Sequence, residues 1–288
     1  MSVRTILVPV TGTDAGLPSL EAAFKLAAHL GAHVEGLHAR RNARDALAYI
    51  GEGMTGAMIE ELITTAEQES TANAQRARHD FAAACENAGF EQTERGGKPG
   101  ERTAHLMIET GAEDELVALR GRVADLIVVM RASKDDDPIL RTTLEGAMLE
   151  SGRPLLVVPP QGIRQPLTPG AIAWNGSAEA ARAVAHALPL LAKAEHVAVI
   201  LIEEGLRPGP SADDLIAYLA RHDIVATTHA MKSDYHATGE ALLNDAREMG
   251  AGFLVMGAYT HSRLRRMIMG SATEFVLSEA ELPVFMMH

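Results

Sequence analysis

A pattern of short apolar runs occurs twice along the chain, and this repetition constrains the fold more than any other feature. In the first half, runs at 125–130 and 154–159 bracket an amphipathic segment. In the second half, runs at 253–256 and 282–287 bracket a segment of similar length. Repetition on this scale indicates that one structural unit is built twice.

The two halves also begin alike. Apolar runs at 5–10 and 171–174 each lead through a glycine-containing turn into a helical pattern. A segment rich in proline and glycine, 161–169, separates the halves and is typical of a linker. A chain of 288 residues is long enough for two compact cores. We therefore predict one domain over 1–160 and a second domain over 170–288.

Strand patterns alternate with helical patterns in both halves. In the first half we predict strands and helices in turn at 3–10, 16–30, 33–39, 55–88, 90–96 (a strand), 101–120 (a helix), 124–130, 142–151 and 154–159. In the second half the alternating elements are predicted at 170–174, 177–192, 195–202, 211–222, 224–231, 236–250, 252–257, 270–279 and 282–287. Several strands are continuously apolar, as expected where helices cover both faces of a parallel sheet. The predicted fold class is α/β, with two doubly wound parallel-sheet domains in tandem.

Composition excludes several classes of partner. The formal net charge is −12, and an acidic surface disfavours nucleic acids and anionic membranes. No apolar run approaches the roughly 18 residues that a membrane-spanning helix needs. Cys85 is the only cysteine, so no disulfide can form within the chain, which fits a reducing compartment. We expect a cytoplasmic protein that binds neither nucleic acid nor membrane.

The segment that follows the predicted strand 252–257 carries the strongest chemical signal. It begins at Gly257, continues as a polar and basic loop, and ends at Gly270-Ser271, where a helical pattern starts. Glycines let the backbone approach an anion, and a helix N-terminus presents unpaired N–H groups to it. The alternative is purely structural, because glycine also ends strands and serine is a common helix cap.

A second loop is expected beside the first. Asn175-Gly176-Ser177 follows the predicted strand 170–174 and opens a helix. Ligands of open α/β sheets bind beyond the carboxyl ends of the strands, where the strand order reverses. Two such loops at one sheet edge predict a site for a mononucleotide.

On these residues both halves resemble universal stress protein (UspA-like) domains, and the whole chain resembles a tandem universal stress protein. The nucleotide-binding members carry the pattern Gly-x-x-Gly-x9-Gly-Ser/Thr. Here Gly257 takes the first position, nine residues separate Thr260 from Gly270, and Ser271 takes the last position. Thr260 stands where the family has its second glycine. The resemblance implies the adenine nucleotide alpha hydrolase-like fold.

The resemblance also implies a ligand and a set of contacts. The ligand would be ATP, or ADP or AMP, and whether Mg accompanies it is left open. Phosphate would meet the glycines and Ser271, ribose would lie near Tyr259 and Thr260, and adenine near Asn175 and the backbone of Ile202. The full set of candidate nucleotide contacts is Asn175, Ile202, Met256, Gly257, Tyr259, Thr260, Gly270, Ser271 and Ala272.

The first half departs further from the family pattern. Arg131 and Lys134 occupy its two glycine positions, and three aspartates follow at 135–137. Carboxylates at a phosphate position repel the anion. We therefore predict a degenerate first half that pairs with the second as an intrachain pseudo-dimer, since universal stress proteins pair through their terminal strands. Homodimer formation by the whole chain is left open.

Other motifs give weaker signals. His29, His33 and His38 are not spaced to converge on one ion, so we predict no metal site. No P-loop, GxGxxG fingerprint or nucleophile elbow occurs in the sequence. The loop supplies no evident general base, so we predict no catalytic residue and favour a stress sensor or regulator. Two alternatives stay open: a nucleotide-free interaction or dimerisation module, and a slow ATP hydrolase.

Overall fold

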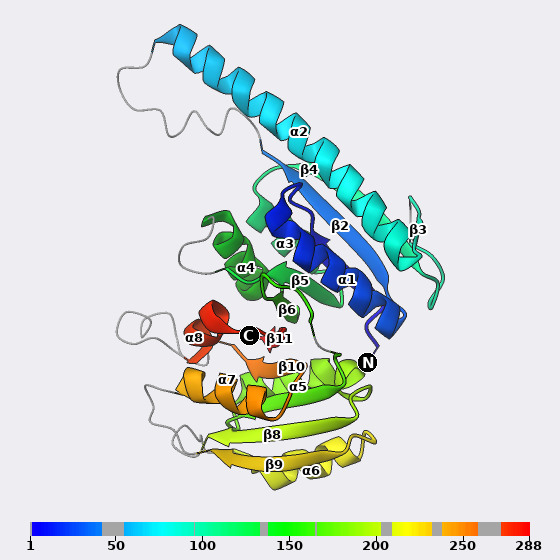
Figure 1. Ribbon diagram of the computed structural model, residues 1–288, viewed down its shortest axis with the longest axis vertical. Coiled ribbons are helices and arrows are strands. Elements are labelled where there is room, and N and C mark those ends of the chain that lie inside the picture. The colour runs from blue at the N-terminus through cyan, green and yellow to red at the C-terminus, as the bar shows by residue number, and fades with distance from the viewer. Residues whose placement is uncertain are drawn as a thin grey trace.

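The computed structural model describes residues 2–41, 55–94, 96–132, 138–164, 166–202, 209–231, 238–258 and 272–288. Within these residues the strands form one 11-stranded sheet in the order β3-β4-β2-β1-β5-β6-β11-β10-β7-β8-β9 (Figure 1). The pairs along the sheet are parallel except for β6 and β11, which are antiparallel. Among the described helices, none is both long enough and apolar enough to cross a membrane.

The first half contributes six strands and the helices between them. The strands are β1 (Thr5–Pro9), β2 (His33–Arg40), β3 (Glu91–Gln92), β4 (Thr103–Thr110), β5 (Leu126–Met130) and β6 (Leu155–Val158). The helices are η1 (Asp14–Gly16), α1 (Leu17–Leu30), α2 (Gly56–Ala88), α3 (Glu113–Gly121) and α4 (Pro138–Glu150).

The second half repeats the core of this arrangement. Its strands are β7 (Pro169–Trp174), β8 (His196–Ile202), β9 (Ala226–Met231), β10 (Phe253–Gly257) and β11 (Val284–Met287). Its helices are α5 (Ala178–Leu191), α6 (Ala212–Ala220), α7 (Thr238–Glu248) and α8 (Ala272–Glu279). The spatial order β9-β8-β7-β10-β11 matches β4-β2-β1-β5-β6 of the first half.

Helices cover both faces of the sheet. One apolar core lies under α1, α2, α5 and α6, and the other lies under α3, α4, α7 and α8. Both cores contain residues of both halves, for example Leu156 and Ile172 on the first face. Each half is thus a doubly wound parallel sheet, which confirms the predicted fold class.

The antiparallel pair β6–β11 joins the two halves. Leu156 of β6 lies opposite Phe285 of β11, and both side chains are buried. The halves therefore meet through their terminal strands inside one chain, and the sheet continues from one to the other. Residues 161–168 of the predicted linker lie between β6 and β7, Pro169 already begins β7, and we keep 161–169 as the proposed boundary.

One predicted stretch of secondary structure was wrong. The segment 101–120 was expected to be a single helix, but it forms β4 and then α3, and the expected strand 90–96 shrinks to the two residues of β3. Leu106, Met107 and Glu109 favour helices in isolation. Pairing with β2 along the whole of β4 overrides that preference. Gly111, with φ of 154°, ends the strand before α3 begins.

Helix α2 extends well beyond the sheet at its N-terminal end (Figure 1). Its C-terminal part packs on the body through buried Ala77, Phe81 and Cys85. Phe81 meets the ring of Phe24 at 5.5 Å in an edge-to-face arrangement. Aromatic pairs of this kind contribute stability beyond that of their buried apolar area, and they favour a particular ring geometry. Thr55 caps the N-terminus of α2 and Gly89 caps its C-terminus, and these two residues set the length of the helix.

Candidate functional site

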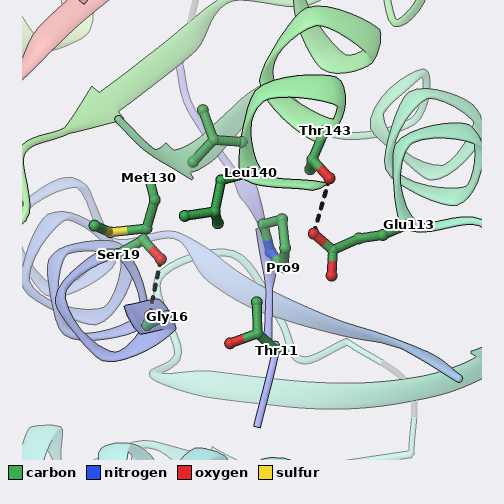
Figure 2. Close-up of a pocket in the computed structure, with 9 residues that line it drawn as sticks. Pro9, Thr11, Gly16, Ser19, Glu113, Met130, Leu140 and Thr143 are labelled. Atoms are coloured by element: carbon green, nitrogen blue, oxygen red, sulfur yellow. Dashed lines mark hydrogen bonds between the residues drawn. The ribbon is translucent and has the colours of Figure 1, made fainter. Parts of the chain in front are cut away.

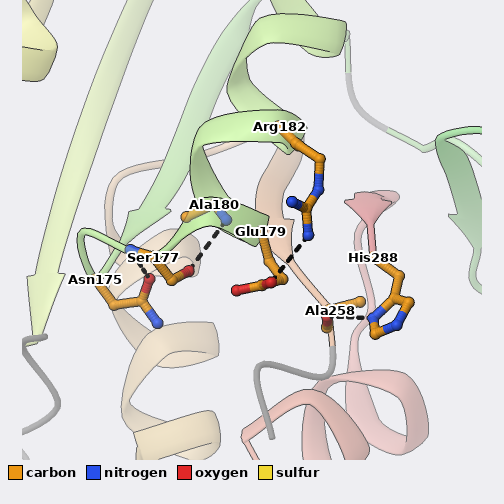
Figure 3. A network of polar contacts seen from close by, with 7 residues as sticks. All are labelled: Asn175, Ser177, Glu179, Ala180, Arg182, Ala258 and His288. Carbon is orange, nitrogen blue, oxygen red and sulfur yellow. Dashed lines mark hydrogen bonds and ion pairs between the residues drawn. The ribbon is translucent and has the colours of Figure 1, made fainter. Parts of the chain in front are cut away.

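The carboxyl ends of β7 and β10 form the topological switch point of the second half. β7 and β10 are neighbours in the sheet. The chain continues from β7 to β8 on one side and from β10 to β11 on the other side, so it leaves the two strands in opposite directions. Such a reversal opens a crevice beyond the strand ends, which is the usual ligand position in open α/β sheets. Figure 3 shows the β7–α5 turn and the end of β10 side by side at this edge.

The β7–α5 turn is ordered by its own side chains. The carboxamide oxygen Oδ1 of Asn175 accepts a hydrogen bond from the backbone N of Ser177 at 3.1 Å. Gly176 takes φ of 72°, a conformation that favours glycine. Ser177 then caps α5, because its Oγ accepts from the backbone N of Ala180 at 3.1 Å. The N-terminus of α5 is therefore held in place at the carboxyl edge of the sheet.

Gly257 lies directly against the first turn of α5. A Cβ at this position would stand 2.6 Å from the backbone N of Ala180 and 2.7 Å from the backbone carbon of Glu179. Backbone atoms cannot yield as a flexible side chain can, so only glycine fits without a shift. This close approach brings the start of the glycine-containing loop next to the N–H groups of a helix N-terminus.

The residues around Gly257 fix the end of β10. The backbone N of Ala258 donates to the carbonyl oxygen of Met287 at 2.8 Å. The Nδ1 of His288 lies 3.2 Å from the carbonyl oxygen of Ala258. On α5 the carboxylate of Glu179 pairs with Arg182 at 2.9 Å, so this negative charge has a counter-ion (Figure 3). An anion at the N-terminus of α5 therefore meets a compensated carboxylate.

A third segment reaches the same turn from the β8 side. A Cβ on Gly209 would lie 2.5 Å from the carbonyl oxygen of Gly176, so two glycine backbones are in close contact. The indole Nε1 of Trp174 donates to the carbonyl oxygen of Pro210 at 3.0 Å. Sequence reasoning missed both contacts. The available signal was the placement of the only tryptophan at the end of a predicted strand.

The structure brings together only part of the predicted nucleotide set. Asn175 and Gly257 both flank the first turn of α5. Met256 is buried within β10, which leaves only its backbone available to a ligand. Ile202 ends β8, and Ala272 begins α8. The remaining predicted contacts lie outside the described residues: Tyr259, Thr260, Gly270 and Ser271.

The histidines considered as metal ligands have other partners. His33 Nδ1 bonds Thr103 Oγ1 at 2.8 Å, and buried His38 bonds the carbonyl oxygen of Val10 through Nδ1 at 2.6 Å. His29 lies elsewhere, at the end of α1. Across the described parts of the chain, no group of three His, Cys, Asp or Glu side chains is arranged to hold a metal ion.

Acidification is expected to destabilise the fold through these histidines. Burial lowers the pKa of His38 below its ordinary 6.5, and burial lowers the pKa of His33 as well. In the unfolded chain both side chains take up a proton below about 6.5, so stability is complete above that pH and falls as pH decreases through it. We expect the free energy of unfolding in urea to decrease from pH 7 to pH 5. His38→Asn keeps a hydrogen-bond donor near Val10 and should reduce the dependence of this free energy on pH. His222→Asn, at an exposed position, should leave that dependence unchanged. Equal pH dependence in the wild type and both variants would contradict the role of His38.

Known structures of the same overall size share this architecture. The chain is similar to a universal stress protein from Archaeoglobus fulgidus, with 19% identity, a TM-score of 0.66, and coverage of 99% of this chain and 96% of that one. The present chain therefore has the universal stress protein fold. A putative universal stress protein from Pseudomonas aeruginosa matches at 16% identity and a TM-score of 0.56, over 99% of this chain and 93% of that one. No protein-family model matches the sequence, and neither does any curated protein.

A protein of unknown function from Pseudomonas aeruginosa has the same fold over 99% of this chain and 92% of its own, at 15% identity and a TM-score of 0.55. At these identities the likeness establishes the shared fold. The match extends along both halves of the chain, so each half is a unit of the universal stress protein fold.

A small pocket lies at the equivalent position in the first half of this universal stress protein fold. The described residues at the ends of β1 and β5 enclose about 10 Å³, room for about one water molecule. Pro9, Met130 and Leu140 line this space, and the hydroxyl of Thr143 donates to Glu113 Oε1 at 2.9 Å beside it (Figure 2).

Proposed function

We propose that the C-terminal half binds an adenine nucleotide at the carboxyl ends of β7 and β10. The observation that carries the proposal is the convergence of three segments on the N-terminal turn of α5. Gly257 lies against the backbone of Glu179 and Ala180, and Gly209 lies against Gly176 in the turn at 175–177 that leads into the helix. A helix N-terminus with glycine backbone beside it is a setting that favours phosphate.

The residues present fit a nucleotide. Gly257 packs directly on the first turn of α5, where a Cβ would come within 2.6 Å of the backbone N of Ala180, and the carboxylate of Glu179 in that turn is paired with Arg182. The sequence adds the basic loop and the Gly270-Ser271 pair at the start of the last helix pattern. The proposed ligand is ATP, or ADP or AMP. Mg²⁺ would supply charge compensation for the phosphates when bound.

We assign the protein a sensing or regulatory role in a stress response. Nucleotide occupancy would then be the signal, and the first half would be a non-binding partner joined through β6 and β11. The sequence supports this division, because Arg131 and Lys134 replace the family's glycines in the first half and three aspartates follow at 135–137. The acidic net charge of −12 and the single buried cysteine support a cytoplasmic location.

ATP is expected to raise the melting temperature of the wild-type protein. A ligand that binds only the folded state stabilises it by about 2.7 kcal/mol at 100 times its dissociation constant. Gly270→Val should remove the shift while the protein stays folded, because the valine side chain blocks backbone approach to phosphate. Differential scanning calorimetry with and without millimolar ATP measures both.

The melting temperature and a phosphate-release assay together separate the two alternative functions. An unchanged melting temperature at millimolar ATP would favour the nucleotide-free interaction module. A phosphate-release assay comparing wild type with Ser271→Ala tests the hydrolase alternative. Release that is lost in the variant would support hydrolysis at this site, and release that is unchanged would exclude it.

A further inference from the structure

Trp174 is the only tryptophan of the chain and lies at the carboxyl end of β7. Its side chain is 4% exposed and belongs to the apolar core beneath α5 and α6. A buried indole N–H needs an acceptor, and here it donates to the carbonyl oxygen of Pro210 at 3.0 Å. One side chain therefore joins the strand end to a segment 36 residues further along the chain.

The segment that Trp174 holds is short and tightly placed. Gly209 lies against Gly176, and a Cβ there would approach the carbonyl oxygen of Gly176 to 2.5 Å. Ser211 follows and caps α6, accepting from the backbone N of Asp214 at 3.1 Å while its own N donates to the Asp214 carboxylate at 2.9 Å. Residues 209–211 are thus fixed to the β7–α5 turn on one side and to α6 on the other.

We propose that Trp174 is a positioning residue that fixes residues 209–211 as the β8-side wall of the candidate crevice. This inference rests on the proposed nucleotide site, because the wall adjoins the same turn that flanks Gly257. The opposite boundary is the end of β10, which contacts α5 through Gly257. A wall that is already ordered spares a ligand the entropic cost of ordering it, so the indole bond raises affinity without touching the ligand.

The core-filling role of Trp174 can be separated from its positioning role. Trp174→Phe keeps an aromatic ring in the core but removes the N–H donor, which leaves the Pro210 carbonyl without this partner. Gly209→Ala keeps the indole but places a Cβ near the Gly176 carbonyl oxygen. Both variants are expected to release the same segment by different means. Tyr218→Phe, which removes a polar group from a partly exposed ring on α6, is the matched control.

The experiment combines hydrogen–deuterium exchange of the free protein with calorimetric titration of ATP. We expect amide exchange at Ser211 and Ala212 to accelerate in both variants, by about tenfold in Trp174→Phe, where the factor corresponds to one lost hydrogen bond. We expect ATP affinity to fall by a similar factor, while Tyr218→Phe matches the wild type in both measurements.

Three outcomes would contradict either the positioning role of Trp174 or the proposed nucleotide binding. Exchange in Trp174→Phe that equals the wild-type rate would show that the indole does not fix the segment. Faster exchange with unchanged ATP affinity would show that 209–211 is not a wall of the site, and the proposed function would stand. A wild-type protein that binds no nucleotide would end the proposed function, and the exchange rates would still decide whether Trp174 fixes the segment.

Discussion

Replacing Gly257 with alanine is expected to abolish ATP binding and to lower the free energy of unfolding by about 1–3 kcal/mol, as overpacking in a filled core does. The added Cβ would come within 2.6 Å of the Ala180 backbone N, so β10 and α5 must move apart. That movement would displace the start of the loop from the helix N-terminus. Urea unfolding measures the stability, and calorimetric titration below the unfolding transition measures ATP binding.

The control for this variant is Gly56→Ala. A Cβ on Gly56 meets no atom within 4 Å, and the residue begins α2 far from the candidate site. Alanine is a better helix former than glycine, so stability should be unchanged or slightly higher and ATP binding should be unaffected. Normal ATP affinity in Gly257→Ala would contradict the assigned position of the site.

Replacing Phe285 with alanine is expected to lower the free energy of unfolding by about 3–5 kcal/mol. Phe285 is 2% exposed and lies between Leu156 of the first half and Val255 of the second. Because the sheet and its cores continue across this strand, both halves should unfold in one transition at lower urea. Circular dichroism, which reports on all helices, and Trp174 fluorescence, which reports on the second half, should give the same midpoint.

Phe275→Ala is the matched control, since the Phe275 ring on α8 is 37% exposed. Its effect should be distinctly smaller, because less apolar area is lost and less cavity is created. Two separate transitions in Phe285→Ala, with the circular dichroism midpoint of the first half unchanged, would contradict the view that β6–β11 joins the halves into one cooperative unit.

The second half could be predicted from sequence almost element by element. Its strands are short and apolar, and its helices begin at clear caps such as Ser177 and Ser211. The first half was harder at one place only. In β4 the residues favour a helix locally, and the pairing with β2 that makes it a strand involves residues about 70 positions apart, such as Val34 and Ala104. Pairing over that separation is not visible in local periodicity.

The position of the candidate site stays a prediction, and several of its local contacts could not be inferred from the sequence. Glycine spacing pointed to the end of β10, yet the same Gly257 is also required by contact with the α5 backbone, which no motif encodes. Asn175 is predicted to contact adenine, and the sequence does not reveal that its carboxamide oxygen also orders the turn by accepting from the backbone N of Ser177. The wall formed through Trp174 depends on a contact across 36 residues and could not be inferred from spacing.

The number of adenine nucleotides carried by one chain tests the central claim most directly. Native mass spectrometry of the purified protein, after incubation with ATP, measures that number as a mass increment. The account predicts one nucleotide per chain in the wild type and none in Gly270→Val. No bound nucleotide would contradict the proposed function, and two per chain would contradict its assignment to the C-terminal half alone.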